Sequence, residues 1–172
     1  MSNRAFFYVD GIPTKGIWID IDSTTNTDDV LEALAKDNLI PRNEDGEPEY
    51  GGDLLVADTE GDLARAFYES RHDTLDLDGL VEAIDYCEEH YTDEAAVAAY
   101  IDDRGQWDRS DFEDAYCGEY DSEVAYAEEL FDDCCLHNVP KSVRHYIDYE
   151  KFSRGLFITD YYFTNGYVFR RT

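Results

Sequence analysis

The sequence predicts an α+β fold that carries a strongly negative charge. Short apolar runs near both ends of the chain are typical of strands, whereas apolar residues in the middle recur at helical spacing. With 43% hydrophobic and 15% aromatic residues, the 172-residue chain can build a core. It also has 41 acids and 14 Lys or Arg residues, for a net charge of −27. The composition is therefore that of a folded, anionic protein and not of a disordered one.

The N-terminal third predicts a small α+β unit. Residues 6–9 (FFYV) and 16–21 (GIWIDI) are predicted to be two strands joined by a turn. Thr27 is the predicted N-cap of a helix through DDVLEALAKD, because two acids follow it in the first turn and apolar residues then share one face. Residues 41–53 are rich in turn formers, and residues 54–57 (LLVA) predict a third strand.

Helices are predicted in the middle of the chain. Three apolar stripes recur at helical spacing: Leu63, Ala66 and Phe67; Leu77, Leu80, Val81 and Ile84; and Val97, Tyr100 and Ile101. Thr92 is the predicted cap of the third helix. The sequence from Ser110 to Glu113 predicts a capping box, and Gly118 is a predicted helix stop.

The C-terminal part predicts two more helices and a hairpin. Ser122 is the predicted start of one helix, with Val124, Ala127 and Phe131 on its inner face. Pro140 suits the first position of a further helix. Two aromatic runs around Asn165-Gly166 predict a closing hairpin.

The negative charge is unevenly distributed. Residues 1–60 carry 14 acids and 4 bases, residues 61–140 carry 24 acids and 4 bases, and residues 141–172 carry 3 acids and 6 bases. The densest stretch, residues 111–134, has ten carboxylates and no Lys, Arg or His, yet aromatic residues are threaded through it. Because the aromatics suit a core, the sequence predicts carboxylates held on the outer faces of short helices.

Two explanations of this acidity are open. A halophile's surface would be evenly acidic, whereas carboxylates that stand in for phosphates would be concentrated, as they are in this chain. B-DNA carries one charge per about 1.7 Å of axis, so a charge of −27 matches about 46 Å of duplex. The acids predicted to mimic phosphates are Glu88, Glu89, Asp102, Asp103, Asp111, Glu113, Asp114, Glu119, Asp121, Glu123, Glu128, Glu129, Asp132 and Asp133.

The charge also restricts the partners. An anionic protein repels nucleic acids and anionic membranes, so its natural partners are basic surfaces. The sequence has no apolar run long enough to span a membrane and no signal-peptide pattern at its N-terminus. We therefore expect a cytoplasmic protein that binds neither nucleic acid nor membrane.

One motif raises an enzymatic alternative. Asp20-Ile-Asp22-Ser-Thr24 follows an apolar strand and resembles the DxDxT nucleophile loop of haloacid dehalogenase-type phosphatases, in which the first Asp attacks phosphorus. No alternation of strands and helices follows it, so strand-end acids are the favoured interpretation and no enzyme is expected. The phosphohydrolase stays open as an alternative.

No metal or cofactor site is expected. Residues 74–85 (TLDLDGLVEAID) approach the calcium-loop pattern but lack its final Glu, and a helix start is the favoured interpretation. The four histidines lie far apart in the sequence. The four cysteines fit no zinc pattern and are predicted to be reduced, partly buried thiols.

The C-terminal half resembles the ArdA antirestriction family, DNA mimics carried by plasmids, transposons and phages. The resemblance rests on FEDAYCGEYDSEVAYAEE (112–129), Val139-Pro140, YIDYE (146–150), Phe152, Arg154, Leu156, Gly166 and Phe169, with thinner matches at Tyr8-Val9, Gly16, Trp18-Ile19-Asp20, Asp58 and Gly61. The family's antirestriction segment typically reads Phe-Ala-Arg-Asp-Leu, where this chain has Phe152-Ser153-Arg154-Gly155-Leu156.

The resemblance implies a fold and a function. It implies an elongated chain of three small domains: α+β (1–61), a helical bundle (62–109) and α+β with the antirestriction segment (110–172). It implies a homodimer joined through the C-terminal domains. It also implies an inhibitor that occupies the DNA-binding cleft of Type I restriction–modification enzymes, including their methyltransferase core, in a bacterial host cell.

The C-terminal segment suits a dimer interface. Two chains of this charge can meet only where the local charge is low, and residues 141–172 are mildly basic and rich in aromatics. The predicted interface residues are Tyr146, Tyr149, Phe152 and Arg154, the first three sharing one side of a helix. The alternative is a domain core whose Arg144, Arg154 and Arg170 pair with the acidic helices of the same chain.

Overall fold

The computed structural model describes residues 2–171 and has a mixed α+β fold, as predicted. The chain forms two compact units, residues 1–107 and 108–172. The boundary between them lies two residues before the predicted start of the C-terminal domain. The further division at residues 61 and 62 falls inside the first unit and stays a prediction.

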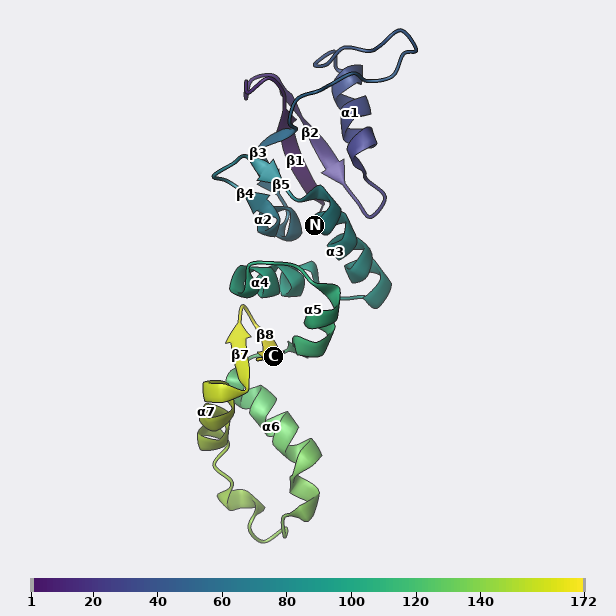
Figure 1. The fold of residues 1–172 in the computed structure, drawn as a ribbon. Coiled ribbons are helices and arrows are strands. Elements are labelled where there is room, and N and C mark those ends of the chain that lie inside the picture. The colour runs from purple at the N-terminus through teal and green to yellow at the C-terminus, as the bar shows by residue number, and fades with distance from the viewer. Residues whose placement is uncertain (1, 172) are drawn as a thin grey trace. The chain divides into compact units, whose positions relative to one another are not determined.

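The first unit is built on a three-stranded antiparallel sheet (Figure 1). Its strands are β1 (Asn3–Tyr8), β2 (Gly16–Ile21) and β3 (Leu55–Glu60), in the order β2-β1-β3 with Phe6 opposite Trp18. Helix α1 (Thr27–Lys36) contacts β2 and buries Val30 and Leu34 completely. The apolar side of α1 that the sequence predicted thus forms part of the core.

Helices complete the first unit. They are α2 (Asp62–Ala66), α3 (Leu77–His90) and α4 (Glu94–Arg104), with a short hairpin of β4 (Tyr68–Glu69) and β5 (Thr74–Leu75) between the first two. Buried Asn3 joins three elements, because its side chain accepts from the Ala64 amide (3.1 Å) and donates to Glu94 (3.0 Å). The two-residue strands were not predicted, because they are too short to show an alternation of apolar and polar residues.

The second unit combines a second sheet with a helix pair. Its helices are α5 (Arg109–Ala115), α6 (Glu123–Cys134) and α7 (Tyr149–Thr159), with short 3-10 turns η1 (Leu136–Asn138) and η2 (Arg144–Tyr146). Its strands are β6 (Tyr116–Glu119), β7 (Tyr161–Thr164) and β8 (Tyr167–Arg170), antiparallel in the order β6-β8-β7. Helices α6 and α7 pack against each other (Figure 1). The predicted hairpin around Asn165-Gly166 is confirmed, and both residues have positive φ.

Three helix caps differ from the prediction. Asn26, Asp93 and Asp108 cap α1, α4 and α5, and not Thr27, Thr92 and Ser110. In each case an Asx side chain accepts the amide hydrogen bonds of the first turn, as Asn26 does from residues 28 and 29. These residues are better N-caps than Thr, and a carboxylate there also favours the helix dipole. The Ser122 cap of α6 is confirmed.

Two other predictions in the C-terminal part are wrong. Pro140 begins a hydrogen-bonded turn that closes at Val143 (N···O 3.0 Å), and the next α-helix begins only at Tyr149, capped by Asp148. Gly118 does not stop a helix but lies within β6 at φ 115°. That strand follows α5 directly, so no turn residues mark its start in the sequence.

Candidate acidic interface

Helix α6 presents the densest group of the predicted acids. Four carboxylates are exposed on one side of it: Glu128, Glu129, Asp132 and Asp133. Residues three and four apart on a helix are neighbours, so these four form one cluster. Tyr126 and Ala127 on the other side are buried, and this packing holds the helix on the second unit. The cluster therefore lies on a fixed element.

The mean charge density along α6 is close to that of a nucleic-acid strand, although the carboxylates are concentrated in residues 128–133. The helix has twelve residues and five carboxylates, Glu123 included. At a rise of about 1.5 Å per residue this gives one carboxylate per about 3.6 Å, against about 3.4 Å per phosphate in one strand of B-DNA. Within residues 2–171, no Lys, Arg or His nitrogen forms an ion pair with these carboxylates. The charge of the helix is therefore not compensated locally.

The other five predicted acids of the second unit lie outside α6. All are exposed, on α5, β6 and the turn after it: Asp111, Glu113, Asp114, Glu119 and Asp121. Phe112, which is fully buried, packs against Phe169 of β8 (ring centroids 6.1 Å apart) and so fixes α5. Arg109 lies 3.3 Å from Glu113 and compensates one of the charges.

The remaining four predicted acids belong to the first unit. Glu88 and Glu89 are exposed on α3, and Asp102 and Asp103 are exposed on α4. The Ser23 hydroxyl donates to Glu88 (2.7 Å). All fourteen acids are thus exposed, ten in one unit and four in the other, and their role in binding stays a prediction.

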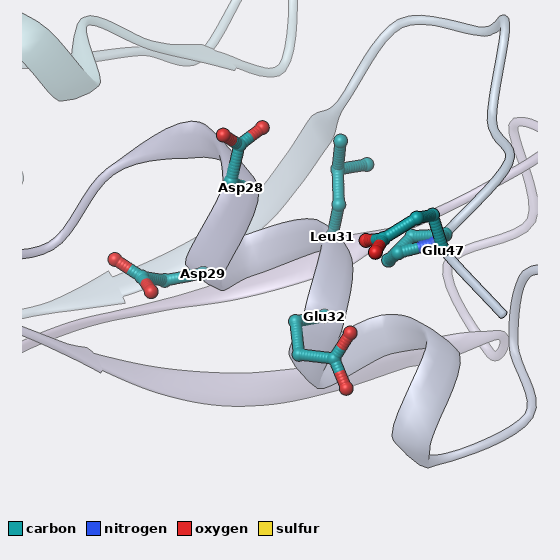
Figure 2. A pocket seen from close by; sticks show the side chains of 6 residues that line it. Asp28, Asp29, Leu31, Glu32 and Glu47 are labelled. Carbon is teal, nitrogen blue, oxygen red and sulfur yellow. The ribbon is translucent and has the colours of Figure 1, made fainter. Parts of the chain in front are cut away.

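The first unit also has an acidic group that was not predicted from the sequence. A hollow of about 410 Å³ is lined by Asp28, Asp29, Leu31, Glu32, Glu47 and Pro48. Figure 2 shows the side chains that line it. Three of its carboxylates come from α1, and the loop after the helix supplies the fourth. Arg42 holds this loop to α1 through two hydrogen bonds to Glu32, and the Arg42 hydrogen bond lowers the pKa of that carboxyl. The contact between Arg42 and Glu32 could not be predicted from the sequence, because the residues of an irregular loop do not recur at a regular spacing.

The predicted dimer residues have different surroundings. Tyr149 and Phe152 pack against Phe131 of α6, with ring centroids 5.7 and 5.1 Å apart, whereas Tyr146 is 78% exposed and Arg154 is also exposed. Tyr146 ends η2, and α7 begins only at Tyr149. The expectation that Tyr146, Tyr149 and Phe152 share one side of a helix is therefore wrong.

The basic residues of the C-terminal segment do not pair with the acidic helices. Arg144 donates to the backbone oxygens of Val139 (3.0 Å) and Leu136 (2.9 Å), and the guanidinium of Arg170 lies over the Tyr161 ring. Within residues 2–171, neither they nor Arg154 form an ion pair. The internal pairing considered from the sequence is therefore wrong for these three residues.

The structure does not provide the fold that the phosphohydrolase alternative needs. Asp20 lies on β2, an edge strand of an antiparallel sheet, and not at the carboxyl end of a parallel one. Asp22 closes a local turn, in which its Oδ1 accepts from the Thr24 amide (2.9 Å) and from the Thr24 and Thr25 hydroxyls. These hydrogen bonds, the Thr24 hydroxyl's first, lower the pKa of Asp22. The carboxylate is thus occupied in shaping the turn.

A double substitution tests this alternative. For the inhibition of a restriction enzyme that the resemblance implies, Asp20→Asn with Asp22→Asn should change inhibition by less than about twofold, because two of many weak ionic contacts would be lost. A phosphohydrolase would lose all activity with its nucleophile. The measurement is DNA cleavage by the target enzyme against inhibitor concentration, and complete loss of inhibition in the double variant would support the enzyme hypothesis.

No metal site is found among residues 2–171. The stretch that approached a calcium loop is a helix start, because Asp76 caps α3 by accepting from the Gly79 amide (3.0 Å). The four cysteines are free, as predicted, but Cys134 is exposed. Burial raises the pKa of the Cys87 thiol to about 12. No helix in the described part of the chain has the length and apolar character to cross a membrane.

The fold and these side chains define an acidic α+β protein with a candidate interface for a cationic surface. No curated protein matches the chain. The model of the antirestriction protein (ArdA) family matches residues 8–169, so the chain belongs to this family.

Proposed function

We propose that the chain inhibits Type I restriction–modification enzymes by occupying the DNA-binding cleft of their methyltransferase core. The observation that carries this proposal is the uncompensated group of carboxylates on α6, whose mean density along the helix is close to that of the phosphates of a strand, in a chain of the antirestriction family. A cleft that holds DNA through Lys and Arg would meet the carboxylates with the same side chains. No chemical step is involved, and the protein acts as a binding inhibitor in the bacterial cytoplasm.

Inhibition of this kind depends on salt and on DNA. Added to a Type I enzyme, the protein should suppress DNA binding and cleavage, and excess cognate DNA should restore both. Raising the salt concentration should weaken inhibition, because the contacts are ionic. Inhibition that DNA does not relieve would contradict the proposal.

The proposal includes a homodimer joined through residues 140–172. This segment is the part of the chain with net positive charge. Tyr149 and Phe152 contribute to packing within the second unit through Phe131. Among the described residues of this segment, the most exposed large apolar side chains are Tyr146 (78% exposed) and Ile158 on α7 (70% exposed), and both stay available for a partner copy.

Charged substitutions at these exposed positions test the dimer. Tyr146→Asp with Ile158→Asp should convert a dimer into a monomer without loss of folding, because neither side chain is part of the core. Phe152 is a poorer choice, since a charge there would also disturb its contact with Phe131. Sedimentation at high salt, where the repulsion between the two acidic chains is screened, measures the oligomeric state. A wild-type protein that is monomeric under these conditions would refute the dimer, and Ile12→Asp, exposed in the first unit, is the control.

A further inference from the structure

Two tyrosine hydroxyls reach the acidic side of α6 from neighbouring elements. Tyr120 lies in the turn after β6, and its hydroxyl donates to Glu129 Oε1 at 3.1 Å. Tyr149 begins α7, and its hydroxyl donates to Asp132 Oδ1 at 2.9 Å. Glu129 and Asp132 are three residues apart, so the two tyrosines hold neighbouring members of the carboxylate cluster.

The rings of both tyrosines are themselves fixed by packing. The Tyr120 ring meets the buried Tyr126 ring edge-on, with centroids 5.0 Å apart. The Tyr149 ring is perpendicular to that of Phe131, with centroids 5.7 Å apart. Each hydroxyl is therefore held in a defined position, and its hydrogen bond in turn orients an exposed carboxylate.

A tyrosine is suited to this task because it is a neutral donor. A hydrogen bond from Lys or Arg would orient the carboxylate but cancel its charge, as Arg42 does for Glu32 in the first unit. Burial, and then the hydrogen bond to Glu129, raise the pKa of Tyr120 to about 12, and the hydrogen bond to Asp132 raises the pKa of Tyr149. Both phenols thus stay protonated at neutral pH, so they donate to the carboxylates without adding a positive charge beside them.

The same arrangement occurs in the first unit. Tyr8 and Tyr68 donate to the two oxygens of Asp73, at 2.7 and 3.4 Å. Neutral hydroxyls thus orient carboxylates in both units of a chain that has few bases.

We propose that Tyr120 and Tyr149 are positioning residues, which hold Glu129 and Asp132 in the geometry that a cationic DNA-binding cleft requires while leaving their charge intact. This inference rests on the proposed function. Freely rotating Glu and Asp side chains would lose conformational freedom on binding, and preorganisation removes part of that cost. From the entropy of such side chains we expect each hydroxyl to improve binding by about three- to fivefold, and both together by about tenfold.

The test compares Tyr120→Phe, Tyr149→Phe and their combination with wild type in binding to a Type I methyltransferase. Phenylalanine keeps the ring packing and removes only the hydroxyl. The double variant should bind about tenfold more weakly, yet the slope of log affinity against log salt should be unchanged, because no charge is lost. Glu129→Gln with Asp132→Asn should lower that slope. Tyr91→Phe, at a 96% exposed tyrosine of the first unit, is the matched control and should bind as wild type.

A double-mutant cycle separates positioning from general structure. If Tyr120 acts through the charge of Glu129, Tyr120→Phe should have little further effect in a Glu129→Gln background. A full additional loss there would overturn the inference, as would a Tyr120→Phe/Tyr149→Phe variant that binds like wild type. If wild type itself fails to compete with DNA, the proposed function falls and the inference with it, so the two failures are distinguishable.

Discussion

Neutralising the carboxylate cluster of α6 should reduce inhibition by about a hundredfold. The variant combines Glu128→Gln, Glu129→Gln, Asp132→Asn and Asp133→Asn, which keep the side-chain size and one acceptor oxygen for the tyrosines. Exposed ionic contacts contribute up to about 1 kcal/mol each, so four of them account for about 2–3 kcal/mol, and 1.4 kcal/mol is a factor of ten. The measurement is the inhibition constant for DNA cleavage by the target enzyme.

The same variant should be at least as stable as wild type. Glu128 and Asp132, and likewise Glu129 and Asp133, are like charges four residues apart, and such pairs destabilise a helix by about 0.2–0.5 kcal/mol each. Urea unfolding should therefore show an unchanged or higher midpoint while inhibition falls. Because stability would not fall while inhibition does, the loss of inhibition could not be the result of unfolding.

A control variant with the same change in net charge tests whether the loss of inhibition is specific to the α6 cluster. Glu44, Asp45, Glu47 and Glu49 are exposed on the loop after α1, and neutralising them changes the net charge by the same amount. We expect a loss of inhibition of less than about fivefold, from the weaker long-range attraction alone. An equal loss in both variants would show that inhibition follows net charge and not the α6 cluster.

Removing the Phe112 side chain should have the largest effect on stability. Phe112 is fully buried, stacks on Tyr116 (centroids 5.1 Å apart) and meets Phe169, which is also fully buried. Phe→Ala substitutions in a core cost about 3–5 kcal/mol, because transfer energy is lost and a cavity remains. Phe112→Ala should therefore destabilise the second unit by about that amount, with release of α5 and its three acids.

Urea unfolding measured by near-UV circular dichroism reports this loss. The control is Tyr146→Ala, which removes an aromatic side chain that is mostly exposed and should change stability by less than about 0.5 kcal/mol. A Phe112→Ala protein as stable as wild type would contradict the packing of α5 on β8.

Local signals in the sequence predicted much of the fold. Ser122 was recognised as a cap because it precedes an apolar stripe, and the closing hairpin because Asn165-Gly166 accepts positive φ. Predictions failed where two local signals competed. Thr27 and Thr92 each lie beside an Asx residue that makes the hydrogen bonds instead, and Pro140 suits a turn as well as a helix start.

The candidate site was predicted in part for the same reason. Helical spacing alone places Glu128 and Asp132 on one side of α6, and the structure shows both exposed. Contacts between distant segments leave no such signal. Neither the Tyr149 hydrogen bond to Asp132 nor the position of Glu47 beside α1 follows from a period, because each depends on how a loop returns to the helix.

The most direct test of the central claim is whether the protein and cognate DNA bind a Type I methyltransferase at the same time. A labelled duplex bound to the enzyme should be displaced completely as this protein is added, with an apparent affinity that falls in proportion to the DNA concentration. Higher salt should weaken the binding of both competitors. A ternary complex of enzyme, duplex and protein, detected by sedimentation of the labelled DNA, would contradict occupation of the DNA-binding cleft.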